Sequence, residues 1–307
     1  MAESKRRPLV SILGDSISTF EGCNPEGFDV FYEGERCLTT GVVNRKDTWW
    51  QLVIDALDGE LLANGSFSGS MVEGAGFPAA SSAERIEALS RNGLMPDIVI
   101  VFIGINDYGW GGAANQAAAR ARATPAAAPA CEERVAGAAP LDAAESFARA
   151  YDSMLSRVRA AYPDAQVWCS TLCPGRLTGA DAPTFIRRLR GIDVASYDQA
   201  IRDAAVGYGC KVVDLAAAGR EYDAIDGTHP TALGMRQLAA LMLESMGEQG
   251  IVVDAQEAGL SLQDVFGACD MRADDFCACG ECIGCAFARA TGNAWSLVCE
   301  KGPKESK

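Results

Sequence analysis

The sequence predicts an α/β fold built on a parallel sheet, and three observations carry this prediction. Short apolar runs alternate with helical patterns along most of the chain, as in α/β proteins. The run Asp97–Ile103 continues after its first residue as an unbroken series of β-branched and aromatic residues, which is typical of a parallel strand covered on both faces. The polar and glycine-rich segments follow the apolar runs, where ligand-binding loops lie in such sheets.

Five apolar runs are predicted to be the strands of this sheet, namely 9–13, 60–63, 97–103, 166–172 and 210–215. Helical spacing and capping residues predict helices between and after them, over 48–57, 81–92, 141–162, 193–206 and 231–246. Residues 21–46 show no periodicity and are expected to form a long loop. Residues 109–140 are rich in Ala, Gly and Pro, and we interpret them as a partly helical insertion.

The bulk composition disfavours nucleic-acid-binding, membrane-spanning and secreted proteins. The 307 residues carry a net charge of −14, which disfavours a nucleic-acid or anionic-membrane partner. The longest apolar run, Ile98–Ile105, is far shorter than the ~20 residues that cross a bilayer. No apolar secretory segment follows the basic N-terminus, so we expect a cytoplasmic protein whose twelve cysteines are mostly reduced.

The strongest chemical pattern in the chain centres on a single imidazole. His229 is the only histidine, and Asp226 precedes it by three residues, close enough to orient the ring through a local turn. Ser16 follows the first predicted strand, and a serine hydroxyl needs a base within hydrogen-bonding distance to act as a nucleophile. We therefore predict Ser16 as nucleophile, His229 as base and Asp226 as the residue that orients His229.

An attacking serine also requires hydrogen-bond donors for the oxyanion that forms on the substrate. Three groups are candidates: the backbone N–H of Ser16, the backbone N–H of Gly69 and the side-chain amide of Asn106.

Each of these residues also has a purely structural interpretation. Ser16 could cap a helix, Gly69 could serve a turn, and Asn106 could form an Asx turn. Asp107 is expected to be structural, and Asp223 is the alternative partner for the histidine. Two aromatic residues after Asn106 could equally line a substrate wall or pack in the core, and these are Tyr108 and Trp110.

Four motifs occur in one order along the chain: Gly14-Asp15-Ser16, Ser68-Gly69, Gly104-Ile105-Asn106-Asp107 and Asp226-Gly227-Thr228-His229. In this order and spacing the chain resembles the SGNH (GDSL) hydrolase family over about residues 9–247. The resemblance implies a flavodoxin-like three-layer α/β/α sandwich with a five-stranded parallel sheet, esterase activity without a cofactor or a catalytic metal, and the residue roles given above. The long insertion after Asn106 departs from the simplest members of the family and leaves the shape of the substrate pocket open.

The composition changes after about residue 250, so we predict a hydrolase domain over 1–249 and a small Cys-rich extension over 250–307. Four closely spaced cysteines lie in this extension, namely Cys277, Cys279, Cys282 and Cys285. A structural zinc or iron–sulfur site, free thiols and facultative disulfides all remain open for them.

The sequence as a whole predicts a serine esterase that acts on short acyl esters, such as an acetylated carbohydrate. The substrate is expected to be a small molecule or an oligosaccharide ester. One alternative is a lipase- or thioesterase-like acyl hydrolase. The other is a non-catalytic carbohydrate-binding or metal- or redox-sensing protein on a vestigial hydrolase core.

Overall fold

The computed structural model describes residues 6–122, 143–251 and 259–266. Its centre is a five-stranded sheet in the order β2-β1-β3-β4-β8, and every neighbouring pair of strands is parallel. The strands are β1 (Leu9–Gly14), β2 (Glu60–Asn64), β3 (Ile98–Phe102), β4 (Gln166–Ser170) and β8 (Lys211–Val213). Numbered along the chain within this sheet, the order is 2-1-3-4-5, which is the flavodoxin-like arrangement.

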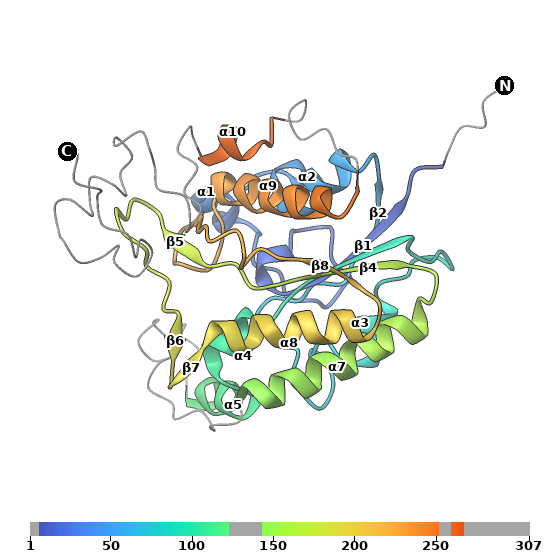
Figure 1. The fold of residues 1–307 in the computed structure, drawn as a ribbon, viewed down its shortest axis with the longest axis horizontal. Helices are drawn as coiled ribbons and strands as arrows, with labels where there is room; N and C mark the ends of the chain where they lie inside the picture. The colour runs from blue at the N-terminus through green and yellow to red at the C-terminus, as the bar shows by residue number, and fades with distance from the viewer. Residues whose placement is uncertain (1–5, 123–142, 252–258, 267–307) are drawn as a thin grey trace, which may run out of the picture.

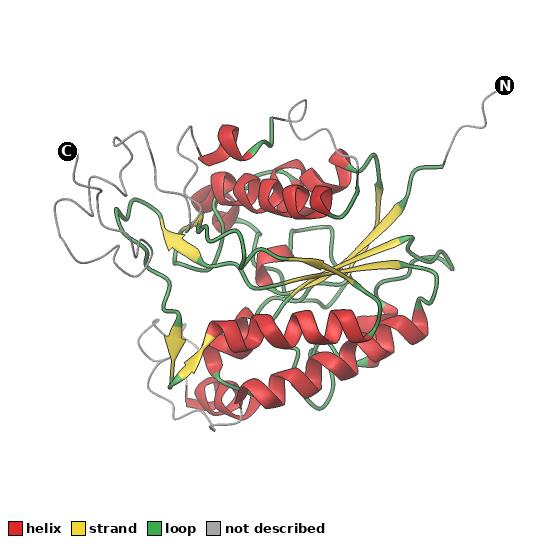
Figure 2. Ribbon diagram, viewed as in Figure 1, coloured by secondary structure: helices red, strands yellow, loops and turns green. Residues whose placement is uncertain are grey.

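Helices cover both faces of the sheet, so the fold is the three-layer α/β/α sandwich that the resemblance implied (Figures 1 and 2). One face carries the helices α1 (Glu35–Thr40), α2 (Trp49–Ala56), α9 (Ala232–Glu248) and α10 (Leu262–Phe266). The other face carries α3 (Ala83–Glu87), α4 (Ile105–Trp110), α5 (Ala113–Arg122), α7 (Ala143–Ala161) and α8 (Val194–Gly207). Two 3-10 helices lie in the connections, η1 (Ser16–Ser18) and η2 (Arg45–Asp47).

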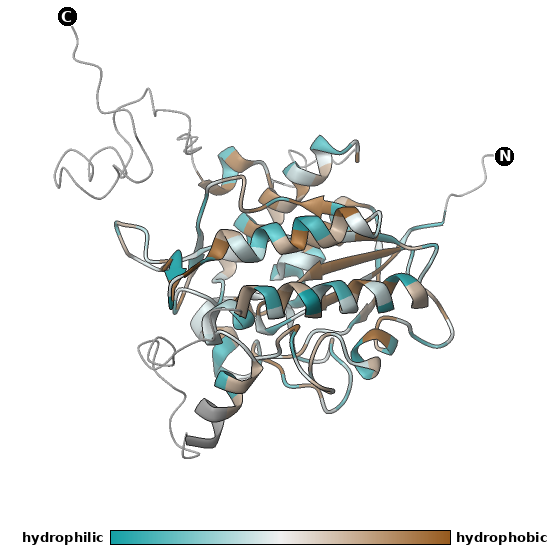
Figure 3. Cartoon of the chain, turned by 60° about the horizontal axis from the view of Figure 1, so that its bottom comes forward, coloured by the Kyte–Doolittle hydropathy of each residue, from teal (hydrophilic) through white to brown (hydrophobic). Residues whose placement is uncertain are grey.

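The side chains of β3 explain why its sequence is continuously apolar. Ile98, Ile100 and Phe102 belong to the core cluster that also contains the residues of α2 and α9. Val99 and Val101 belong to the cluster on the α7 and α8 side. Because both faces are buried, every position of this central strand must be apolar, and Figure 3 shows the central strands as the brown middle of the molecule.

Several helices begin at the capping residues that the sequence offers. The side-chain oxygens of Thr48, Ser82 and Asp193 each accept a bond from a backbone N–H in the first turn of α2, α3 and α8. Thr231 caps α9 in the same way. Each such cap typically contributes ~1 kcal/mol to helix stability.

Two local predictions differ from the structure, and a third agrees with it as far as the chain is described. Helix α3 ends at Glu87 rather than near residue 92, because Asn92 and Gly93 both have positive φ and form a turn between Arg91 and Leu94. The loop 21–46 contains the short helices α1 and η2. The start of the predicted insertion is helical, as α4 and α5, and its remainder lies mostly outside the described residues.

Short strands that the sequence did not predict extend the fold at its carboxyl edge. The strands β5 (Gly175–Leu177) and β9 (Tyr222–Ala224) pair in parallel. The strands β6 (Arg188–Leu189) and β7 (Ile192–Asp193) form a hairpin. The β5–β9 pair matters for the site, because the loop carrying Asp226 and His229 follows β9 directly.

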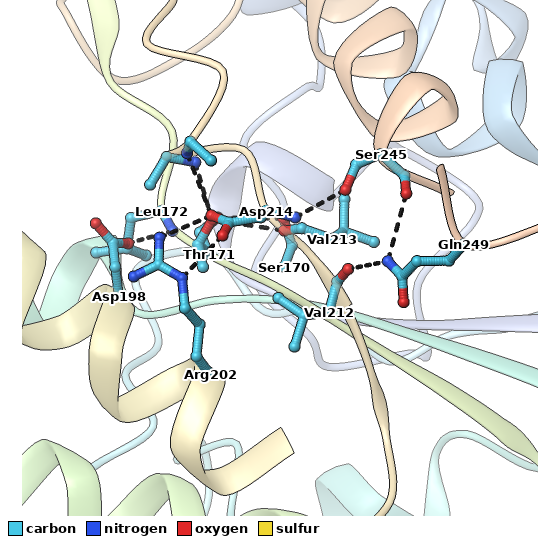
Figure 4. A network of polar contacts seen from close by, with 12 residues as sticks. Ser170, Thr171, Leu172, Asp198, Arg202, Val212, Val213, Asp214, Ser245 and Gln249 are labelled. Atoms are coloured by element: carbon cyan, nitrogen blue, oxygen red, sulfur yellow. Dashed lines mark hydrogen bonds and ion pairs between the residues drawn. The ribbon is translucent and has the colours of Figure 1, made fainter. Parts of the chain in front are cut away.

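A polar network fastens the edge strand β8 to its neighbours (Figure 4). Arg202 on α8 donates two hydrogen bonds to Asp214, of 2.9 and 2.8 Å, and Thr171 Oγ1 donates to the same carboxylate at 3.2 Å. Asp214 N–H in turn donates to Ser245 Oγ of α9 at 2.9 Å. Burial alone would raise the pKa of Asp214, but the hydrogen bond and charge of Arg202 outweigh it and hold the pKa below its ordinary value. The network therefore ties α8, β8 and α9 together.

Candidate active site

Ser16 lies in the tight turn that follows β1. Asp15 caps this turn by accepting a hydrogen bond from the backbone N–H of Ile17 at 3.0 Å. Gly14 precedes it where a Cβ atom would lie 2.5 Å from Ser18 Oγ and 3.0 Å from Ser66 Oγ, so no larger residue fits without displacing the turn. Ser16 itself is only 4% exposed.

The structure brings Ser16, His229 and Asp226 together in one hydrogen-bonded chain. Ser16 Oγ lies 2.9 Å from His229 Nε2, although 213 residues separate them, and His229 Nδ1 lies 2.6 Å from Asp226 Oδ2. Burial acts to raise the pKa of Asp226. The hydrogen bonds and charge of His229, together with the backbone N–H groups, outweigh this effect and lower the pKa to about 2. An ionised carboxylate can only accept, so Nδ1 must donate to it. In the neutral ring Nε2 is then the acceptor for the hydroxyl of Ser16, which is the arrangement that activates a serine oxygen.

The loop that carries the histidine is held from several sides. The second carboxylate oxygen of Asp226 accepts from the backbone N–H groups of Thr228 and His229, at 3.0 and 2.8 Å. Two buried tyrosine hydroxyls donate to carbonyls of the same loop, Tyr222 to Thr228 at 2.6 Å and Tyr32 to Pro230 at 2.9 Å. These bonds fix the backbone on both sides of the imidazole.

The loop that carries Gly69 contacts the helix α4 that carries Asn106. Asn106 is 7% exposed in the first turn of α4, and its Nδ2 donates to the carbonyl of Ser70 at 3.0 Å. An amide nitrogen has two hydrogens, so this bond leaves a second one to donate. Gly69 has a φ of +72°, and its carbonyl accepts from Gln116 of α5 at 2.8 Å. The loop after β2 also contacts the end of β1, where Phe67 N–H donates to the carbonyl of Gly14 at 3.2 Å.

Asp107 has the structural role that we expected for it. Its two carboxyl oxygens accept from the backbone N–H groups of Val72 and Glu73, both at 3.0 Å. Burial raises the pKa of Asp107 to about 7, against the opposing effect of these hydrogen bonds. The side chain thus ties the loop after β2 to α4.

The alternative residues lie elsewhere. Asp223 accepts hydrogen bonds from the hydroxyls of Thr231 and Thr178 and is not the partner of His229. Tyr108 is 2% exposed and stacks on Phe185 with ring centroids 5.8 Å apart, and Trp110 is 9% exposed, so both aromatic residues are packed.

Arg85 is a residue of the site that the sequence did not reveal. It is fully buried, and its guanidinium donates to the carbonyls of Gly14, Gly65 and Pro78 at 2.6, 2.7 and 2.7 Å. Burial lowers its pKa to about 9, with the charge of Asp15 opposing the change, so it stays protonated at neutral pH. Burial likewise raises the pKa of Asp15 to about 7. Arg85 thereby joins the turn of Ser16 to the loop of Gly69.

Within the described ranges, no group of three or more His, Cys, Asp or Glu side chains is arranged to hold a metal ion. The described cysteines are all free thiols, namely Cys23, Cys37, Cys169, Cys173 and Cys210. The four clustered cysteines of the predicted extension lie outside the described residues. None of the helices that the structure describes combines the length and apolar character required to cross a membrane.

Comparison with known proteins agrees with this fold. The model of the GDSL-like lipase/acylhydrolase family matches residues 12–237. A search of curated proteins found no match. A crystal structure from Bacteroides ovatus, of a protein described as a GDSL-like lipase, aligns with a TM-score of 0.51 at 21% identity, covering 80% of this chain and 100% of that one. An aryl esterase of M. smegmatis aligns at 16% identity with a TM-score of 0.48, covering 80% of this chain and 100% of that one.

The family match spans most of the chain and includes all the residues of the site. The protein therefore belongs to the GDSL-like lipase/acylhydrolase family. It is an ester-hydrolysing enzyme of the serine hydrolase type, and the likeness to the Bacteroides ovatus structure supports the fold.

Proposed function

We propose that the enzyme hydrolyses short-chain acyl esters, such as acetylated carbohydrates, through an acyl-enzyme on Ser16. The observation that carries the proposal is the hydrogen-bonded chain from Ser16 Oγ through the imidazole of His229 to Asp226. Ser16 and His229 are only 4% and 9% exposed, which leaves little open surface around Oγ and favours a small acyl group.

In the first half of the reaction, Ser16 Oγ attacks the ester carbonyl carbon while its proton moves to Nε2 of His229. The carboxylate of Asp226 stabilises the imidazolium that forms. The oxyanion accepts hydrogen bonds from the backbone N–H groups of Ser16 and Gly69 and from Asn106 Nδ2. When the tetrahedral intermediate collapses, the C–O bond to the alcohol breaks, and the imidazolium gives its proton to the departing oxygen.

The second half repeats these steps with water. His229 takes a proton from the water as the water oxygen attacks the acyl carbon. The bond to Ser16 Oγ then breaks, the oxygen regains its proton from the imidazolium, and the carboxylic acid leaves. Atoms and charges balance without a cofactor.

The test compares kcat/KM for p-nitrophenyl acetate, butyrate and octanoate and for an acetylated sugar. We expect acetate to exceed octanoate by tenfold or more, and Ser16→Ala to abolish all four activities while the remote Ser90→Ala retains them. A preference for octanoate would instead support the lipase- or thioesterase-like alternative. Absence of hydrolysis for every ester would support the alternative of a non-catalytic protein on a vestigial hydrolase core.

A further inference from the structure

A second aromatic ring lies flat against the imidazole of His229. The ring of Phe31 stacks on it with the two centroids 3.5 Å apart and the planes 3° from parallel. Two neutral aromatic rings avoid such a direct sandwich, because their negative faces repel. A positively charged ring is attracted to the same face. The stack is thus better suited to the imidazolium than to the neutral imidazole.

The segment of Phe31 is hydrogen-bonded to the turn of Ser16 and to the loop of His229. Its backbone N–H donates to Thr19 Oγ1 at 2.9 Å, and the same hydroxyl donates to the carbonyl of Ser16 at 3.0 Å. The next residue, Tyr32, is fully buried and holds the carbonyl of Pro230, which follows the histidine. The segment at Phe31 therefore bridges the turn of the nucleophile and the loop of the base.

The outer side of the Phe31 ring is also covered. The guanidinium carbon of Arg36 lies over this ring, 4.9 Å from its centroid. Because the imidazole occupies one face, Arg36 must lie over the other. The ring is confined between the two groups, which limits its own rotation.

In-plane hydrogen bonds to Ser16 and Asp226 fix the direction of the imidazole but resist tilting out of its plane only weakly. We propose that Phe31 is a positioning residue, which keeps the imidazole of His229 coplanar with its two hydrogen bonds and stabilises the imidazolium during the reaction. This inference rests on the proposed role of His229 as the base.

The test uses Phe31→Leu and Phe31→Tyr, with Phe28→Leu as the matched control. Phe28 lies on the same segment, but its ring contacts Phe67 and Phe77, at 5.6 and 5.3 Å between centroids. Phe31→Leu should lower kcat about tenfold, equal to ~1.4 kcal/mol in the barrier, with KM changed by less than about twofold. Phe31→Tyr and Phe28→Leu should keep kcat within about twofold of the wild type.

A spectroscopic measurement follows the stack independently of activity. Because His229 is the only histidine, its ring protons give a single set of ¹H NMR resonances. The face of Phe31 should shift them upfield, and the shift should disappear in Phe31→Leu and persist in Phe31→Tyr. A dispersed spectrum of Phe31→Leu also shows that this variant folds.

The inference fails if the histidine resonances do not move in Phe31→Leu, if kcat is unchanged, or if only KM rises. Failure of the proposed function is distinguishable, since it would appear as full activity in Ser16→Ala or His229→Ala. With those two variants inactive and Phe31→Leu fully active, only the role of Phe31 would be overturned.

Discussion

Replacing Arg85 by methionine should loosen the loops that carry Ser16 and Gly69. The substitution keeps much of the apolar volume but removes three hydrogen bonds of 2.6 to 2.7 Å from a fully buried guanidinium. The carbonyls of Gly65 and Pro78 would lose their donor at about 1–3 kcal/mol each, whereas the carbonyl of Gly14 keeps the N–H of Phe67. Removing a buried charge recovers part of this cost, so we expect a loss of about 2–5 kcal/mol in the free energy of unfolding.

The same change should lower activity, because the carbonyl of Gly14 is two residues from Ser16. A displacement of about 1 Å at the reacting atoms can reduce the rate by up to ~10²-fold. Urea unfolding and kcat on p-nitrophenyl acetate measure the two effects. Arg157→Met is the matched control, since this exposed arginine donates a single bond of 2.6 Å to the carbonyl of Ser81. If Arg85→Met unfolded within about 1 kcal/mol of the wild type and kept its kcat, the positioning role of Arg85 would be refuted.

Three further predictions follow from the geometry. Asn106→Ala should lower kcat by about 10²–10³ with little change in KM, and a rise in KM alone would make it a substrate-binding residue. Because the pKa of Asp107 is raised to about 7, the folded state binds a proton that the unfolded state has released above about pH 4, so stability should fall as pH rises from 4 to 7. Asp107→Asn should make this decrease in stability with pH shallower, by at most ~1.4 kcal/mol per pH unit. Melting temperatures that decrease equally steeply with pH in both proteins would contradict this. Truncation after Gly250 should lower the melting temperature below that of a truncation after Phe266, because it also removes Leu260 and Val265, which are only 1% and 5% exposed.

The packing of residues 259–266 bears on the predicted domain boundary near residue 250. Gln237 of α9 donates to the carbonyl of Val265 at 3.2 Å, and Leu260 belongs to the core cluster around α9. The two truncations therefore test where the hydrolase domain ends. The boundary itself stays a prediction.

The sheet could be predicted because the sequence of each strand reflects whether its own faces are buried. The apolar run 97–103 is explained by burial on both faces, and it became β3 at Ile98–Phe102. The motifs near Ser16, Gly69, Asn106 and His229 could be found because each follows a strand and has a residue type suited to one chemical task. The parallel topology then brings such loops to one edge.

The supporting residues could not be predicted because only distant contacts define them. Arg85 looks like an ordinary helix arginine in the sequence, yet it donates to the carbonyl of Gly14, 71 residues away. Phe31 and Tyr32 lie in an aperiodic loop, and Tyr32 reaches Pro230 across 198 residues. No local pattern indicates such contacts. The six-residue helix α4 is similarly too short to show a helical period.

The central claim is that Ser16 is a nucleophile activated by His229, and covalent labelling tests it most directly. A fluorophosphonate forms a P–O bond with an activated serine oxygen and releases fluoride. Mass spectrometry of proteolytic peptides from the full chain should place the adduct on Ser16 in the wild type, with no adduct in Ser16→Ala and strongly slowed labelling in His229→Ala. Labelling of another residue, or equal labelling rates in the wild type and His229→Ala, would contradict the account.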